Sequence, residues 1–149
     1  MIGELDADAV VEYFRGKNIL ITGSTGFLGK VLVEKILRVQ PDVEKLFLLV
    51  RAVDVESAKQ RVQTEVTGRE IFGILKDKHG DGFEAFIEEK ICPLPGDIMY
   101  ENFGLGNTQL TGLYRDTDII INGAATTNFF ERSVAFAIDK FLRQHIVNI

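Results

Sequence analysis

The sequence is poor in the residues from which disulfides and metal sites are built. It contains one cysteine, Cys92, and two histidines, His79 and His145, in 149 residues. A lone cysteine excludes a disulfide within the chain and is typical of a reducing compartment. Neither histidine has a cysteine pair or a carboxylate at the spacing of metal ligands, so we expect no metal site.

A basic leader and a long apolar run are also missing. The opening MIGELDADAVVEYF carries acidic residues where a secretory signal needs basic ones, and no run is long enough to cross a bilayer. The 17 basic and 22 acidic side chains give a formal net charge of -5, which repels nucleic acid and anionic membranes. We therefore expect an intracellular protein with no transmembrane segment and no nucleic-acid partner.

Apolar residues are plentiful and fall into short runs. Hydrophobic residues make up 46% of the chain, enough for the core of one domain over residues 1–149. Continuous apolar runs predict four buried strands, at residues 18–22, 45–50, 91–94 and 118–121. Helical spacing predicts helices at residues 6–15 (ended by Gly16), 28–39, 57–67, 70–78, 81–90 and from Val134 onward.

Two details of these helices are predicted as well. The spacing of apolar residues in the second helix predicts a buried face made of Leu28, Val31, Leu32, the stem of Lys35, Ile36 and Val39. Ser57 with Gln60, and Asp81 with Glu84, have the spacing of capping boxes, which predicts where two later helices begin. We interpret the segment between the third and fourth strands as a loop.

The order of elements predicts an α/β fold. A Rossmann-like parallel sheet in the order 3-2-1-4, with helices on both faces, is typical of such a pattern. The helices of residues 57–90 form an insertion between the second and third strands, and the sheet is expected to be truncated after the fourth strand. The apolar run DIII would then be an exposed edge, through which we expect homo- or hetero-oligomers to form.

A glycine-rich turn joins the first strand to the second helix. In TGSTGFLG, Gly23, Gly26 and Gly29 lie three residues apart. The backbone amides of residues 25–28 open the helix, where the positive end of its dipole favours a phosphate, and Gly29 allows the helix to pack close to the sheet. The turn therefore predicts a pyrophosphate site formed by Gly23, Thr25, Gly26, Phe27, Leu28 and Gly29.

The residue after the second strand predicts which dinucleotide is bound. Arg51 follows KLFLLV directly, and an arginine there suits the 2′-phosphate of NADP. Asp54, three residues later, is either the cap of the next helix or a reader of the ribose hydroxyl of NAD. We favour NADPH, with NADH as the alternative.

Two further strand ends contribute candidates. Asp97, in PGDI, is placed to accept a hydrogen bond from an adenine amino group while Ile98 packs on the ring; a turn or capping role is the alternative. After the fourth strand, NGAATTNF offers the small residues Ala124 and Ala125 along the path of the cofactor and Thr126 as a contact to its ribose or phosphate. A close-packed loop is the alternative there.

Several of these stretches together resemble a known family. TGSTGFLGKVLVEKILRVQPDVEKLFLLVRA, the insertion ending in ILKDKHGDGFEAFIEEK, the PGDI strand end and NGAATTNF are similar to the start of plant alcohol-forming fatty acyl-CoA reductases. These are extended short-chain dehydrogenases/reductases akin to thioester reductase domains. The resemblance covers about residues 11–132, and its long insertion is more specific than the glycine turn.

The resemblance implies a function. The family uses NADPH to reduce a long-chain fatty acyl-CoA to a primary alcohol, a step of wax and lipid-barrier synthesis, in the cytoplasm or at the cytosolic face of the endoplasmic reticulum. It implies cofactor contacts from the residues named above: Gly23, Thr25, Gly26, Phe27, Leu28, Gly29, Arg51, Asp97, Ile98, Ala124, Ala125 and Thr126.

The family uses a catalytic tyrosine, a lysine four residues later, and a serine or threonine after the fifth strand, and the resemblance places all three beyond residue 149. Tyr13 and Lys17 have the right spacing but precede the first strand, on the side of the sheet opposite the ligand crevice. We therefore expect no catalytic residue in this chain and no activity from it alone. The alternatives are a non-catalytic protein that associates with full-length reductases and, less favoured, a fragment similar to NAD-dependent sugar-nucleotide epimerases.

Overall fold

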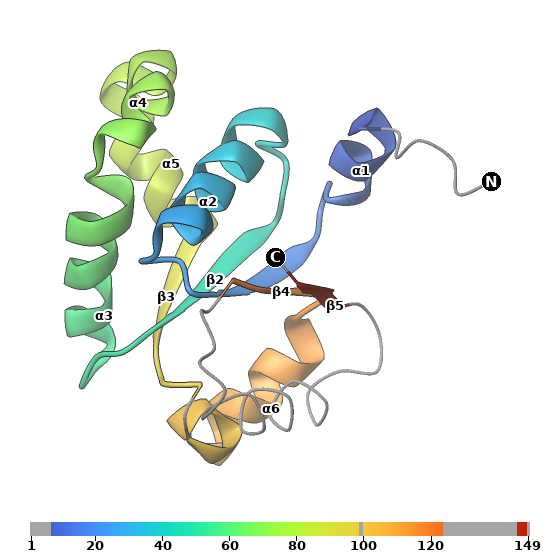
Figure 1. Ribbon diagram of the computed structural model, residues 1–149, viewed down its shortest axis with the longest axis vertical. Coiled ribbons are helices and arrows are strands. Elements are labelled where there is room, and N and C mark those ends of the chain that lie inside the picture. The colour runs from blue at the N-terminus through green and yellow to red at the C-terminus, as the bar shows by residue number, and fades with distance from the viewer. Residues whose placement is uncertain (1–6, 99, 124–145, 149) are drawn as a thin grey trace.

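The computed structural model describes residues 7–98, 100–123 and 146–148. Five parallel strands form one sheet in the order β3-β2-β1-β4-β5 (Figure 1). The predicted order 3-2-1-4 is confirmed. The strands are β1 (Asn18–Thr22), β2 (Lys45–Val50), β3 (Ile91–Pro95), β4 (Ile119–Asn122) and β5 (Ile146–Asn148).

Helices cover both faces of the sheet. Alternate residues of each strand point to opposite faces, and apolar side chains on both faces are buried. Ile19 and Ile21 of β1 join the larger core, while Leu20 between them joins the smaller one. The helices on the larger core are α2 (Phe27–Val39), α3 (Val55–Val62), α4 (Gly73–His79) and α5 (Phe83–Lys90). On the opposite face lies α6 (Asn107–Asp116), drawn in orange in Figure 1.

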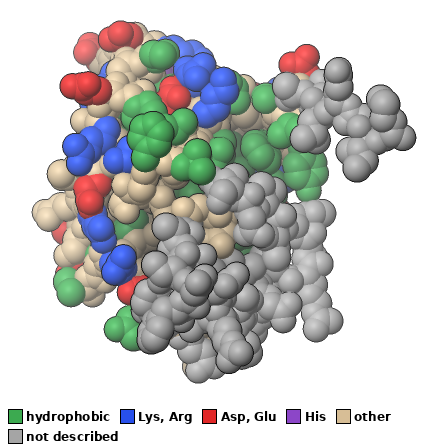
Figure 2. Space-filling model, in the orientation of Figure 1, with side chains coloured by type: hydrophobic (Ala, Val, Ile, Leu, Met, Phe, Trp, Pro, Cys, Tyr) green, Lys and Arg blue, Asp and Glu red, His purple; other side chains and the backbone are tan. Residues whose placement is uncertain are grey.

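The N-terminal helix α1 (Ala7–Tyr13) is followed by Gly16, the residue predicted to end it, whose φ of 69° is in the left-handed region. The predicted insertion between β2 and β3 is also present. It consists of α3, a π-helical turn at Gln63–Thr67, α4 and α5, with short 3₁₀ turns at Glu70–Phe72 and Gly80–Gly82. Figure 2 shows acidic and basic side chains interspersed over this part of the surface.

The buried face of α2 differs from the prediction. Val33 and Leu37 are fully buried, and Ile36 is buried as predicted, but Leu28 is 53% exposed and Lys35 is exposed as well. The apolar residues of FLGKVLVEKILRV cover a wide arc of the helix, so spacing alone does not fix which part of that arc faces the sheet. Gly29 fixes it instead, because only a glycine fits where α2 meets the turn after β1.

Both predicted capping boxes are wrong. Asp54 is the N-cap of α3, where its Oδ1 accepts a hydrogen bond from the Ser57 amide at 2.7 Å. Ser57 therefore lies inside the helix. Gly82 precedes α5 and provides no side-chain cap, while Asp81 belongs to the preceding 3₁₀ turn.

Helix α6 lies in the segment interpreted as a loop. It presents only Leu110 and Leu113 to the core, and its sequence NTQLTGLYRD includes Thr and Gly, which are poor helix formers. The smaller core stabilises it nevertheless, by burying these two leucines against Leu20 and Ile120.

The prediction of an exposed fourth strand is also wrong. Strand β4 is paired on both sides, with β1 and with β5, so the sheet is not truncated there and β4 is not an open edge. The helix predicted from Val134 extends over residues that the structure does not describe, and its expected final stretch includes β5 instead. At the opposite edge, β3 carries Pro93 and Pro95.

The two prolines protect the β3 edge from pairing with another chain. The Gly96 amide donates to the Val50 carbonyl of β2 at 2.9 Å. Because alternate residues of a strand bond to opposite sides, the residues at odd-numbered positions of β3 point their backbone groups away from β2. Pro93 and Pro95 occupy two of these positions and have no N–H to donate to an added strand.

Candidate functional site

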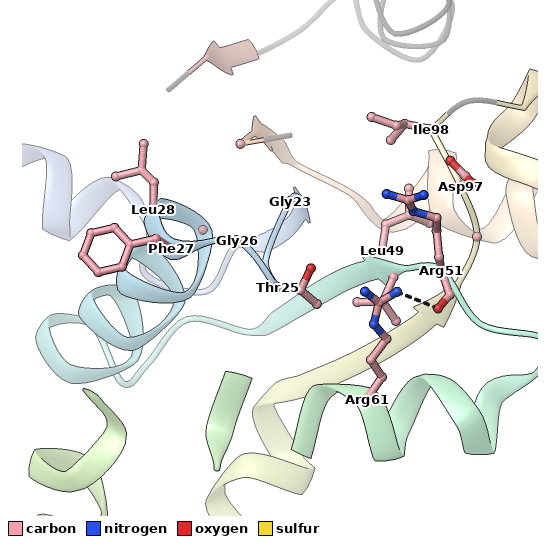
Figure 3. Close-up of a pocket in the computed structure, with 14 residues that line it drawn as sticks. Gly23, Thr25, Gly26, Phe27, Leu28, Leu49, Arg51, Arg61, Asp97 and Ile98 are labelled. Carbon is pink, nitrogen blue, oxygen red and sulfur yellow. Dashed lines mark hydrogen bonds between the residues drawn. The ribbon is translucent and has the colours of Figure 1, made fainter. Parts of the chain in front are cut away.

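A cavity of about 530 Å³ opens at the carboxyl ends of the strands (Figure 3). Nine of the predicted site residues line it. Six come from the turn after β1 and the start of α2: Gly23, Thr25, Gly26, Phe27, Leu28 and Gly29. Three come from the ends of the neighbouring strands: Arg51, Asp97 and Ile98. Ala124, Ala125 and Thr126 lie outside the described residues.

The glycine turn is closed on itself. Gly23 has a φ of 75°, in the left-handed region that glycine adopts without strain, and the Gly26 amide donates to its carbonyl oxygen at 3.1 Å. A Cβ on Gly29 would lie 2.0 Å from that same oxygen. The predicted role of Gly29 in close packing is therefore visible in the geometry.

The start of α2 is arranged to receive an anion. Gly26 is the N-cap residue and provides no side-chain acceptor to the helix. The first amides of a helix have no partner within it, and here they lie at the wall of the cavity. Phe27 and Leu28 are 81% and 53% exposed and both line the cavity, where they add apolar surface beside these amides.

Below the turn, a hydrogen bond joins the ends of β1 and β4. The Thr22 hydroxyl donates to Oδ1 of Asn122 at 2.6 Å, and the Gly123 amide donates to the Thr22 carbonyl at 3.0 Å. Thr22 is buried. These contacts fix the two strand ends between which the crevice opens.

Arg51 and a second arginine lie together at the end of β2. Arg61, on α3, donates from Nη1 to the backbone carbonyl of Arg51 at 2.9 Å and also lines the cavity (Figure 3). Arg61 is a candidate that the sequence reasoning missed. The sequence feature that could have identified Arg61 is its position on the first helix after Arg51, which follows the same strand end.

Asp54 does not join these arginines. Its carboxylate caps α3, and the backbone amide of Ser57 holds its pKa below the ordinary value. Of the two roles left open for Asp54, the structure supports the helix cap. No acidic side chain from the β2–α3 connection lines the cavity within the described part of the chain.

The end of β3 is held by a tight loop. The Asp97 amide donates to the Phe103 carbonyl at 2.8 Å, and a Cβ on Gly96 would lie 2.7 Å from the same oxygen. Phe103 is buried although its φ is 60°, and Asn102 before it has a φ of 55°. Such backbone persists only where packing enforces it, and the hydrogen bond from the Asp97 amide ties the end of β3 to the buried Phe103.

The remaining candidates lie elsewhere. Lys17 Nζ lies 5.3 Å from the centre of the Tyr13 ring, and both residues precede β1. The length of β1, at about 3.3 Å per residue, separates the start of the strand from the crevice end by about 13 Å. Cys92 is half-buried in β3, where burial raises the pKa of its thiol. His79 stacks on Phe86 inside the insertion, with ring centres 4.0 Å apart.

The described ranges contain neither a metal centre nor a membrane-spanning helix. Residues 7–98, 100–123 and 146–148 contain no group of three or more side chains placed to hold a metal ion. Among the same residues, no helix has the length and apolarity needed to cross a membrane.

The cavity suits a dinucleotide. Its open helix start matches a diphosphate, the two arginines match a further phosphate, and Asp97 with Ile98 offers an acceptor and an apolar surface to a purine. Together with the sheet order, these features define a nucleotide-binding domain of Rossmann type.

Comparison with known proteins shows which family of Rossmann-type domains this chain is similar to. The family model described as male sterility protein, an NAD-binding family, matches residues 21–138. Fatty acyl-CoA reductase 1 of Arabidopsis thaliana is 48% identical over 141 residues, which is 93% of this chain and 29% of that protein. The alcohol-forming fatty acyl-CoA reductase of Simmondsia chinensis is 42% identical over 142 residues, 94% of this chain and 29% of that protein.

Solved structures of reductase domains share the fold. The terminal R domain from the myxalamid PKS-NRPS biosynthetic pathway superposes with a TM-score of 0.61 at 26% identity, over 83% of this chain and 29% of that one. The reductase domain of a nonribosomal peptide synthetase from Mycobacterium tuberculosis gives a TM-score of 0.66 at 24% identity, over 97% of this chain and 36% of that one.

The chain belongs to the fatty acyl-CoA reductase family. It spans about 29% of the length of the plant relatives that it matches. The family resemblance predicted from the glycine turn, the insertion and the strand ends is thereby confirmed.

Proposed function

We propose that this chain binds NADPH and forms the cofactor-binding part of a fatty acyl-CoA reductase. The observation that carries the proposal is the pair of arginines at the end of β2, together with the use of Asp54 as a helix cap. A carboxylate at this place would accept a hydrogen bond from the ribose hydroxyl of NADH, whereas guanidinium groups pair with the 2′-phosphate of NADPH.

Different residues of the cavity bind different parts of the cofactor. The amides at the start of α2 bind the diphosphate, Arg51 and Arg61 bind the 2′-phosphate, and Asp97 with Ile98 binds the adenine. Ala124, Ala125 and Thr126 would continue the path of the cofactor. When bound, NADPH would supply a hydride to the thioester carbonyl of a long-chain fatty acyl-CoA, the substrate class that the relatives' names indicate.

The coenzyme preference is tested by titrating the protein with NADPH and with NADH by calorimetry, for the native protein and for Arg51→Ala. A hydrogen bond to a charged group contributes about 1.5–3 kcal/mol, so loss of Arg51 should weaken NADPH binding by about tenfold or more. The affinity for NADH should change less than about twofold, because NADH lacks the 2′-phosphate. Equal loss for both cofactors, or tighter binding of NADH by the native protein, would contradict the proposal.

We further propose that the polypeptide of residues 1–149 binds NADPH without turnover. Its one tyrosine with a lysine four residues later, Tyr13 with Lys17, lies at the other end of β1 from the crevice. The test is NADPH consumption, followed at 340 nm, in the presence of palmitoyl-CoA. No oxidation above a no-enzyme control is expected, and sustained oxidation that requires the acyl-CoA would refute this part of the proposal.

A role as a partner of full-length reductases has less support. One route to such an association, pairing through an open edge at β4, is closed because β5 occupies that edge.

A further inference from the structure

We propose that Glu65 is a positioning residue that sets the preference for NADPH over NADH by holding Arg61 in place. This inference rests on the proposed function of the same cavity. Glu65 does not line the cavity, so it acts only through the arginine.

The guanidinium of Arg61 is fixed at two points. Its Nε donates to Oε2 of Glu65, one helical turn further along, and its Nη1 donates to the backbone carbonyl of Arg51 at 2.9 Å. These contacts leave the Nη2 hydrogens for a ligand. Figure 3 shows the Arg61 guanidinium beside Arg51 at the wall of the cavity. The Arg61 guanidinium is thus already oriented before a phosphate binds, which lowers the conformational entropy lost on binding.

The backbone that carries Glu65 is itself firmly placed. Glu65 lies in the π-helical turn Gln63–Thr67, whose neighbouring residues Val66 and Thr67 are buried. The turn brings its first carbonyl close to Gly68, where a Cβ would lie 2.3 Å from the Gln63 oxygen. A glycine is therefore required for this turn, and π-helical turns occur often at functional sites.

The burial of the pair strengthens the contact. The side chains of Arg61 and Glu65 are 34% and 33% exposed, so the pair is screened less than a fully solvated one. Without Glu65, Arg61 would lose one of its two anchors and would sample other rotamers away from the phosphate.

A purely structural ion pair makes a different prediction. Pairs four residues apart on a helix add little stability, and their loss would affect NADPH and NADH alike. A positioning role affects NADPH alone, because only NADPH carries the group that Arg61 contacts. The ratio of the two dissociation constants therefore separates the two roles.

The experiment measures Kd for NADPH and for NADH by calorimetry in the native protein and in Glu65→Ala, Glu65→Gln and Glu65→Asp. Glu65→Ala should weaken NADPH binding by about threefold to tenfold with NADH unchanged. Glu65→Gln keeps an oxygen that accepts from Nε and should stay within about twofold of the native protein. Glu65→Asp keeps the charge but shortens the reach, so it should behave like Glu65→Ala.

Two controls complete the design. Glu88→Ala removes an ion pair of the same insertion, Lys59 with Glu88 at 3.7 Å, and should leave both affinities unchanged. In an Arg61→Ala background, Glu65→Ala should have no further effect.

The outcomes separate the two levels of the proposal. If Arg51→Ala leaves the NADPH preference intact, the proposed function fails. If Arg51→Ala and Arg61→Ala lower the preference but Glu65→Ala and Glu65→Asp leave it unchanged, only the role of Glu65 is refuted. Equal weakening of both cofactors by the Glu65 variants also refutes it and indicates a structural pair.

Discussion

Replacing Gly29 by alanine should damage both stability and cofactor binding. The new Cβ would lie 2.0 Å from the Gly23 carbonyl oxygen, 2.7 Å from the Gly23 carbonyl carbon and 2.8 Å from the Cα of Ser24. All three are backbone atoms, so no side chain can rotate away. To restore an ordinary contact of about 3.4 Å, the start of α2 must move away from the turn by about 1.4 Å.

That displacement has two measurable consequences. Overpacking of this kind costs typically about 1–3 kcal/mol, here because Val33, Ile36 and Leu37 on the same helix face lose contact with the sheet. The amides at the start of α2 also move relative to Arg51 and Asp97, which do not shift. We therefore expect weaker binding of NADPH in addition to the lower free energy of unfolding.

The assay is urea unfolding together with calorimetric titration of NADPH, and the matched control is Gly112→Ala. Gly112 lies in α6, where a Cβ would meet nothing within 4 Å. Alanine there should raise the free energy of unfolding by about 0.5–1 kcal/mol and leave binding unchanged. If Gly29→Ala and Gly112→Ala gave the same stability and the same Kd, the argument from the close approach would be refuted.

Two other substitutions test local features. Asp54→Ala should lower the urea midpoint at neutral pH, because it removes the cap of α3. The folded-state pKa of Asp54 is lowered from its ordinary value of 3.8, so the native advantage should be complete above that pH and should disappear as the pH falls through the lowered pKa. An advantage that is unchanged at low pH would contradict this reading. Ser24→Ala removes a buried hydroxyl that has no hydrogen-bond partner in the described part of the chain. Urea unfolding should show a gain of up to about 1 kcal/mol, and a loss of that size would indicate an unseen partner.

The strands were predictable because each depends on a short apolar run, and their order followed from the arrangement typical of folds with this sequence of elements. NILIT and KLFLLV are continuous apolar runs that only a doubly covered parallel strand can bury, and both strands have the predicted bounds. The glycine turn was predictable for a related reason. Gly23 has a positive φ and Gly29 approaches the Gly23 carbonyl oxygen, so glycine is needed at both positions, and their spacing between a strand and a helix indicates the turn.

The features that were missed depend on contacts between distant segments. The rotation of α2 is set by the approach of Gly29 to Gly23, and α6 is stabilised by two leucines that pack on the far face of the sheet. The cap of α3 had two candidates in the sequence, Asp54 and Ser57, and only the backbone geometry separates them. Arg61 is adjacent to Arg51 in space because the insertion folds back on the end of β2.

The pairing of β4 with β5 was missed for a similar reason. Helical spacing from Val134 onward predicted a helix through the last residues, whereas Ile146–Asn148 is a strand beside β4. A short run such as IVN has little strand signal of its own, and only its neighbour in the sheet defines it.

The central claim is that the arginines at the end of β2 bind a 2′-phosphate. The most direct measurement compares 2′,5′-ADP with 5′-AMP by calorimetry, since these ligands share the adenosine and 5′-phosphate and differ only in the group that Arg51 and Arg61 are proposed to bind. We expect at least about tenfold tighter binding of 2′,5′-ADP, reduced to less than about threefold in Arg51→Ala. Equal affinity for the two ligands in the native protein would contradict it.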